Sequence, residues 1–95
     1  MAVCRFVETP ATPEQYDQVM ARVTAGGAST EGRTVHVAAV GDDGKIRIFD
    51  VWDSQSQAEA FGEAVRAARE EAGITEEPKV SILDVHNQIL IHQPS

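Results

Sequence analysis

Two residues with complementary chemistry, His36 and Asp50, lie in segments where apolar and polar side chains alternate. The segments 34–40 and 45–52 flank the turn sequence Gly-Asp-Asp-Gly and therefore predict a β-hairpin. Residues that oppose each other on one face of a hairpin have Cβ atoms about 4.5–5.5 Å apart. At that distance a carboxylate can fix the tautomer of an imidazole, as proton transfer by histidine requires. The alternative is a structural cross-strand hydrogen bond, which is the simpler interpretation of the pair.

Four further residues are expected on the same face of the sheet, and each has a structural interpretation beside a binding one. Arg5 is expected between Asp50 and Asp84, where it either neutralises a buried cluster or holds a substrate carboxylate or developing enolate. Trp52 can form an aromatic wall for a flat ligand, but a tryptophan at the edge of an interface is equally ordinary. Asp84 and His86, two residues apart on the last strand, complete the predicted substrate-binding group.

Neither a metal nor an organic cofactor is expected. His36, His86 and Asp50 could approach one another, but the chain has no close-spaced metal-ligand motif. It also has no glycine-rich turn between a strand and a helix, which a flavin or nicotinamide dinucleotide would need. Cys4, the single cysteine, is interpreted as a buried small hydrophobe rather than a nucleophile.

Hydrophobic periodicity and turn residues predict the elements that position these side chains. Strands are expected at 2–8, 34–40, 45–52 and 79–87, and helices at 13–25 and 54–72. Thr12, just before the first helix, and Ser54, at the start of the second, can cap them. The order βαββαβ is that of the ferredoxin-like α+β fold, a four-stranded antiparallel sheet with two helices on one face.

The length of the hairpin loop decides which residues face each other. A three-residue loop over 42–44, with Gly44 in the left-handed conformation, opposes His36 to Asp50. A four-residue loop would oppose Val35 to Asp50 and mix the two faces of the sheet. The three-residue loop keeps each face chemically consistent and is the prediction.

Alternation divides the strand residues between two faces of the sheet. One face is almost purely apolar and consists of Cys4, Phe6, Val35, Val37, Phe49, Val51, Leu83 and Val85. The other combines the polar candidates with Val3, Val7, Val40, Ile46, Ile48, Val80 and Ile82. We expect the helices to cover the purely apolar face and the mixed face to stay open in one protomer. Because an exposed apolar patch usually marks an interface, the mixed face predicts a homodimer around a ligand-binding lumen, which a charge at Ile48 would disrupt.

Composition limits the remaining possibilities. The 95 residues predict one domain, 1–95, that ends in an extended C-terminal tail over 88–95. Lys and Arg number 8 against 15 for Asp and Glu, so the chain carries a net charge of −7. Without a basic stripe, binding to nucleic acid or to an anionic membrane surface is not expected. The chain has neither a leader-like start nor a long apolar segment, which predicts a cytoplasmic protein.

The chain resembles the dimeric α/β-barrel superfamily, and within it small uncharacterised bacterial members of the antibiotic-biosynthesis-monooxygenase-like branch. The resemblance is carried by the size, the βαββαβ order, the segment from Ile48 to Ser54 that leads into an Ala/Phe helix, and the Val85-His86-Asn87 ending. It implies a homodimeric barrel with a pocket on the sheet face away from the helices. It implies no single reaction, because the superfamily includes cofactor-independent oxygenases, heme enzymes, isomerases and dehalogenating enzymes.

Heme degradation is not expected from this resemblance. The heme-degrading members use an asparagine in the first strand, a tryptophan in the second helix and a histidine further along that helix. Here the corresponding strand offers Arg5, the tryptophan position resembles Phe61, and the second helix contains no histidine. Two functions stay open: a cofactor-independent monooxygenase, isomerase or cyclase acting on a small, partly aromatic or enolisable molecule, or a non-catalytic small-molecule binding or assembly module.

Overall fold

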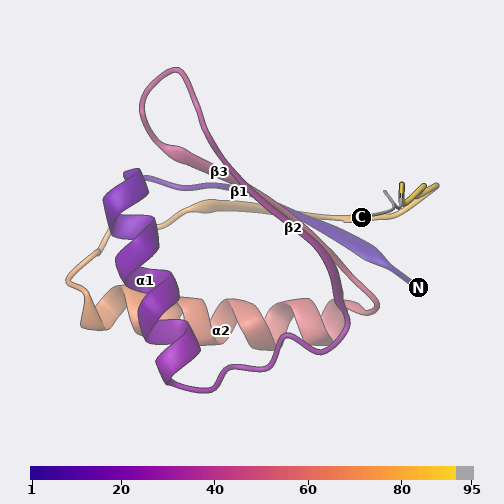
Figure 1. Ribbon diagram of the computed structural model, residues 1–95, viewed down its shortest axis with the longest axis horizontal. Helices are drawn as coiled ribbons and strands as arrows, with labels where there is room; N and C mark the ends of the chain where they lie inside the picture. Colours follow the sequence, from indigo (N-terminus) through magenta and orange to yellow (C-terminus); the bar gives the residue numbers. More distant parts are fainter. Residues whose placement is uncertain (92–95) are drawn as a thin grey trace.

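The computed structural model describes residues 1–91, and its elements follow the predicted order βαββαβ (Figure 1). The strands are β1 (Val3–Glu8), β2 (Arg33–Val40), β3 (Ile46–Trp52) and β4 (Lys79–Asp84), and the helices are α1 (Pro13–Ala25) and α2 (Gln55–Glu71). They form one antiparallel sheet of order β2-β3-β1-β4, with both helices on one side of it. The ferredoxin-like α+β fold is therefore confirmed.

The predicted hairpin register is confirmed. His36 opposes Asp50 across β2 and β3. The loop consists of residues 42–44: the Gly41 N–H donates to the Lys45 carbonyl at 2.8 Å, and Gly44 has a φ of 78°. Glycine populates that left-handed conformation without the steric cost other residues meet.

Local capping sets the start of each helix. The Thr12 hydroxyl accepts from the Gln15 N–H at 3.3 Å, and the Gln15 side chain accepts from the Thr12 N–H at 2.9 Å. This capping box satisfies two amide groups that have no partner within α1. At the start of α2, the Ser54 hydroxyl accepts from the Gln57 N–H.

The prediction of which sheet face the helices cover is wrong. The helices cover the mixed face, so Ile48 is 7% exposed, and Arg5 and Asp50 are buried beneath them. The purely apolar face is the open one, and Val37, Phe49 and Leu83 on it are large and exposed. The face taken for the lumen is thus the interior of one protomer.

The handedness of the connection from β1 through α1 to β2 explains why the helices cover the mixed face. β1 and β2 both pair antiparallel with β3, so they run parallel to each other and α1 connects them. Connections of this kind cross over right-handedly in nearly all proteins, which places the helix on one defined side of the sheet. This preference does not depend on which face of the sheet is more apolar, so apolarity alone did not predict the covered face. Apolar residues of the mixed face still supply a core, in which Val3 and Trp52 pack against Val19 and Phe61.

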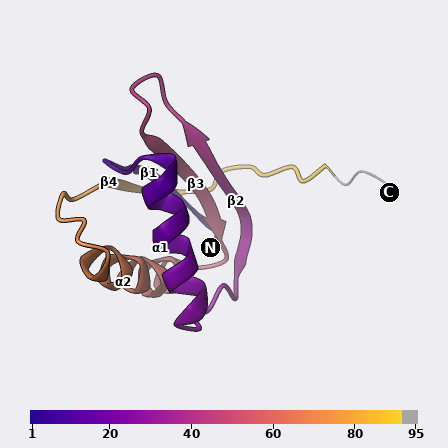
Figure 2. The same cartoon turned by 60° about the vertical axis from the view of Figure 1, so that its left-hand side comes forward.

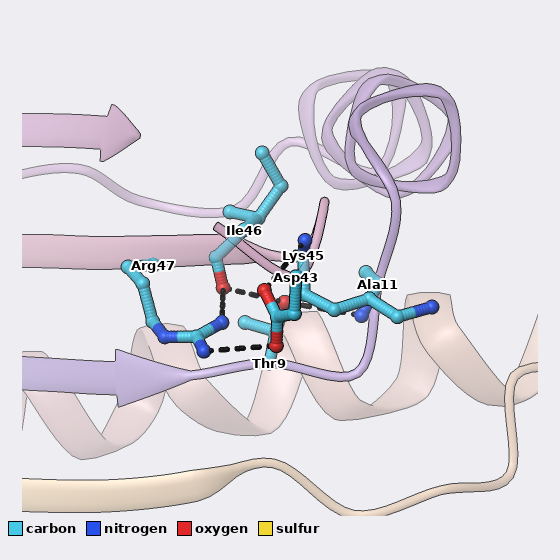
Figure 3. Close-up of polar contacts among 6 residues, drawn as sticks. All are labelled: Thr9, Ala11, Asp43, Lys45, Ile46 and Arg47. Carbon is cyan, nitrogen blue, oxygen red and sulfur yellow. Dashed lines mark hydrogen bonds and ion pairs between the residues drawn. The ribbon is translucent and has the colours of Figure 1, made fainter. Parts of the chain in front are cut away.

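The segment between β1 and α1 is hydrogen-bonded to the start of β3, next to the turn of the hairpin (Figure 3). The Thr9 hydroxyl donates to the Ile46 carbonyl at 2.9 Å and accepts from the Ala11 N–H at 3.1 Å. The Ile46 N–H in turn donates to the Ala11 carbonyl at 2.9 Å. Beside them, the Asp43 carboxylate accepts from Arg47 at 3.1 Å. The bonds of Thr9 and Ala11 hold the segment that precedes α1 against the start of β3.

The last strand is shorter than predicted. β4 ends at Asp84 rather than residue 87, after which the Val85 N–H donates to the Ala2 carbonyl at 3.0 Å. Residues 85–91 extend away from the sheet without regular secondary structure (Figure 2). Residues 92–95, which belong to the predicted tail, lie outside the described residues. In the described range, no helix is both long and apolar enough to span a membrane.

Candidate active site beneath the helices

The predicted pair His36 and Asp50 is in direct contact. The His36 Nδ1 atom lies 2.5 Å from Asp50 Oδ1, and Asp50 is only 1% exposed. An ionised carboxylate can only accept hydrogen bonds, so Nδ1 carries the proton in this contact. In a neutral imidazole the second nitrogen, Nε2, is then an acceptor. Asp50 therefore assigns the tautomer of His36, as the hairpin register predicts.

Tyr16 is a third member of this arrangement that the sequence analysis did not single out. Its hydroxyl lies 2.6 Å from His36 Nε2 and donates to it in the tautomer set by Asp50. Tyr16 lies on α1 at helical spacing from the buried Val19 and Val23, a pattern typical of core residues. The sequence contained one signal for this contact: a tyrosine at helical spacing from core residues is expected to be partly buried, and its hydroxyl then needs a hydrogen-bond partner. The result is a hydrogen-bonded chain from Tyr16 through His36 to Asp50.

Arg5 lies on the far side of Asp50 from the histidine. Its guanidinium is 3.8 Å from Asp50 Oδ2, and only 9% of its side chain is exposed. Burial lowers the pKa of Arg5, the Asp50 charge raises it, and the nearby Arg69 lowers it. The predicted placement of Arg5 between two carboxylates is half wrong, because its neighbour on β4 is Ile82 and Asp84 opposes Val3.

The other three predicted substrate-binding residues do not join this group. Asp84 and His86 are exposed at the end of β4 and beyond it. Trp52 is fully buried, with its ring 5.3 Å from that of Phe61, so it belongs to the core rather than to a ligand-facing wall. The guanidinium of Arg33 lies over both rings, 5.1 Å from the centroid of Phe61.

In the described part of the chain, three cavities between the sheet and the helices border Arg5, His36 or Asp50. The largest, which we call the Tyr16 cavity, measures about 400 Å³. It is lined by Tyr16, Met20, Val23, Thr24, Ala28, Thr30, Arg33, His36 and Phe61. An inner cavity of about 40 Å³ lies next to it and reaches Arg5 and Asp50. The third, the Arg69 cavity, measures about 200 Å³ and is lined by Arg5 and Arg69 among others. Of these three, the Tyr16 cavity reaches the roughly 300–1,000 Å³ usual for small-molecule sites.

No family model and no curated protein matches this chain, but solved structures do. A candidate antibiotic biosynthesis monooxygenase from Chloroflexus aurantiacus has 23% identity and a TM-score of 0.58, over 93% of this chain and 97% of that one. The chain has the fold of these proteins. SnoaB of Streptomyces nogalater, a cofactor-independent oxygenase, has 12% identity and a TM-score of 0.60, over 93% and 94%. A protein of unknown function from Nitrosomonas europaea has 16% identity and a TM-score of 0.70, over 97% and 96%.

The likeness to antibiotic-biosynthesis-monooxygenase-like structures extends over nearly the whole chain but stops at the fold. At these identities, a shared backbone does not carry a reaction from one protein to another. The chemistry of this protein depends on its own side chains. Within residues 1–91, no group of three or more His, Cys, Asp or Glu side chains is arranged to hold a metal ion.

The phenol of Tyr16 is expected to stay protonated well into the alkaline range. Burial raises its pKa above the ordinary 10.0, Asp50 raises it further, and Arg33 opposes this. Since the folded state holds this proton more tightly, its contribution to stability is complete below pH 10 and is lost as the pH rises through the folded-state pKa. Tyr16 is the single tyrosine, so ultraviolet titration of tyrosinate reports it alone. A midpoint at or below that of a free tyrosine would contradict this.

Proposed function

We propose that this protein is a homodimer that binds a small, partly aromatic or enolisable molecule in the Tyr16 cavity and removes a proton from it without a cofactor. The observation that carries the proposal is the chain of contacts from Tyr16 to Asp50, because its hydroxyl end borders a cavity large enough for a ligand. A hydrogen-bonded chain that ends on a buried carboxylate is suited to moving a proton inward.

The proton transfer follows from the assigned tautomer. The Tyr16 oxygen accepts a proton from an acidic C–H bond of the ligand while its own proton passes to His36 Nε2. The ligand becomes an enolate, the imidazole becomes an imidazolium, and the net charge of the site is unchanged. Asp50 stabilises the imidazolium through Nδ1 at 2.5 Å. The guanidinium of Arg33, which lines the same cavity, lies where it can stabilise the enolate.

Two outcomes are open to such an enolate, and both belong to the class proposed from the sequence. Return of the proton to another carbon gives an isomerase. Reaction of the enolate with molecular oxygen gives a cofactor-independent monooxygenase. The name of SnoaB, a cofactor-independent oxygenase with the same fold, favours the second outcome.

Hydrogen exchange tests the proton-transfer step without knowledge of the natural ligand. β-Tetralone is a small aromatic ketone with an acidic benzylic C–H bond, and its exchange in deuterium oxide is followed by NMR. We expect the protein to accelerate exchange by roughly 10²-fold or more over buffer, the size of a positioned general base. An oxygen electrode in the same experiment separates oxygenation from isomerisation. If β-tetralone binds in the cavity and its exchange is no faster than in buffer, catalysis by this site is contradicted.

The second candidate is a non-catalytic binding module, and one observation favours it. Both ring nitrogens of His36 already have partners within the protein, as in a structural hydrogen-bond chain. In that case the same cavity binds the ligand, and the Tyr16–His36–Asp50 chain stabilises the protomer.

The open sheet face supports the proposed homodimer. It presents Val37, Phe49 and Leu83, which are 49%, 45% and 60% exposed, and the Phe6 ring packs 4.6 Å from that of Phe49. A second copy meeting this face would remove these side chains from water. The proposed dimer uses the face opposite to the one expected from the sequence, and the ligand cavity lies within each protomer.

A further inference from the structure

Two guanidinium groups with unused donors border the Arg69 cavity, which lies between β1, β4 and α2. The Arg5 side chain forms no hydrogen bond within residues 1–91, and its ion pair with Asp50 spans 3.8 Å, beyond hydrogen-bond distance. The Nε–H group of Arg69 is buried and has no partner in the same range of residues. Its terminal nitrogen lies 3.4 Å from the exposed carboxylate of Glu77. A buried donor without an acceptor is unfavourable, so the Nε–H group of Arg69 lacks an acceptor although its terminal nitrogen donates to Glu77. The carboxylate oxygen nearest to Arg5, Asp50 Oδ2, is also buried without a hydrogen-bond partner, so the guanidinium keeps donors that a ligand can use.

The positive charge of these two groups is incompletely balanced inside the protein. Asp50 is the buried carboxylate next to Arg5, and one of its oxygens already accepts from His36. Among the glutamates at the rim of the cavity, Glu63 is exposed and pairs with Arg66 at 2.9 Å. Carboxylates at the water-exposed rim attract these cations only weakly, because water screens the interaction. The two guanidinium groups lie at lower dielectric and therefore attract a negative charge inside the cavity more strongly. The interior is therefore suited to a negative charge, although the chain as a whole carries −7.

The rest of the cavity favours an organic anion over an inorganic one. Its apolar wall consists of Ala58, Val65, Pro78, Val80 and Ile82. Gly62 lies in the middle of α2 facing Arg5, and a Cβ atom added there would lie 3.5 Å from the Arg5 guanidinium. Glycine inside a helix is less favourable than alanine, and here it leaves the cavity open in front of the cation. The glutamates at the rim disfavour a dianion such as phosphate.

We propose that the Arg69 cavity binds a small monocarboxylate with an apolar body, whose two oxygens accept hydrogen bonds from Arg5 and Arg69. An arginine fork matches the planar geometry of a carboxylate, and such charge-assisted bonds are stronger than neutral ones. The site lies apart from the Tyr16 cavity, so it does not depend on the proton-transfer function. Both cavities adjoin the inner cavity, which Arg5, Asp50 and His36 line together.

Titration of the intact protein with benzoate, benzamide and inorganic phosphate tests this site. We expect benzoate to bind, with NMR shift changes centred on Gly62 and Arg69, and the neutral isostere benzamide to bind at least about 10-fold more weakly, as loss of charged hydrogen bonds predicts. Phosphate should bind more weakly than benzoate, because it gains nothing from the apolar wall. Equal binding of benzoate and benzamide would overturn the proposal, as would benzoate shifts confined to the Tyr16 cavity.

Variants locate the binding groups. Arg69→Gln should weaken benzoate binding by about 10- to 100-fold. Gly62→Leu should abolish binding by filling the cavity while adding a good helix former. The matched control is Arg66→Gln, which removes an exposed, paired cation from the rim and should change affinity less than about threefold. Folded Arg69→Gln protein that binds benzoate like the unaltered chain, or an equal loss in Arg66→Gln, would overturn the assignment.

Discussion

Replacing His36 by Gln is expected to lower the rate of β-tetralone exchange by roughly 10²–10⁴-fold, the usual effect of a lost general base. Glutamine keeps hydrogen-bonding capacity at similar volume, so the fold should survive, as circular dichroism and thermal unfolding can check. Its amide has no basic nitrogen and cannot take the proton passed on by Tyr16. The rate should therefore fall while binding of the ketone changes little.

Tyr16→Phe decides how His36 takes part. If the proton travels through the phenol, removal of one oxygen atom should reduce exchange to a similar extent as His36→Gln. If the imidazole acts on the ligand directly, the phenylalanine variant should exchange at least as fast as the unaltered protein, because Nε2 is no longer occupied by the hydroxyl. The matched control is Thr24→Val, since Thr24 lines the same cavity and lies outside the hydrogen-bonded chain.

Asp50→Asn provides the third comparison. Asparagine preserves the shape and can still accept from Nδ1–H, but it removes the charge that stabilises the imidazolium and that pairs with Arg5. The rate should fall less than in His36→Gln, and the pH dependence of exchange should shift. Should His36→Gln and Asp50→Asn both unfold while ketone binding to the remaining folded protein is normal, the chain of contacts is structural and the binding-module function holds.

Phe49→Glu is expected to separate the proposed dimer into folded protomers. Phe49 is 45% exposed on the open sheet face, so a glutamate there is solvated in a single protomer and desolvated only when a second copy covers it. Burying an unpaired charge should raise the dimer dissociation constant by at least about 100-fold. Light scattering at micromolar concentration should then give the dimer mass for the unaltered chain and the protomer mass for the variant.

Ile48→Glu provides the matched comparison, because Ile48 is the sequence neighbour of Phe49 on the opposite face. It is 7% exposed beneath the helices, so a charge there is buried within the protomer and should unfold it. A monomeric mass for the unaltered protein would contradict the dimer. If Ile48→Glu gave folded monomers and Phe49→Glu folded dimers, the interface would lie on the other face, as first expected from the sequence.

Several features were predictable from the sequence because they depend on neighbours along the chain. Side chains alternate within a strand, Thr12 caps the helix that follows it, and the loop with Gly44 sets the hairpin register. These local rules together brought His36 opposite Asp50. They also assigned each strand residue to one of two faces, although not to the covered or the open one.

What the sequence left open depends on how the elements cross in space. The handedness of the connections places the helices over the mixed face, so Arg5 and Asp50 are interior residues rather than parts of an interface. The same packing brings Tyr16 from α1 to His36 on β2, and Arg69 from α2 close to Arg5 on β1. No spacing along the chain encodes these contacts, because each joins elements whose relative position is decided by helix packing on the sheet. Local sequence thus determined the His36–Asp50 pair, and tertiary structure alone decided what borders it.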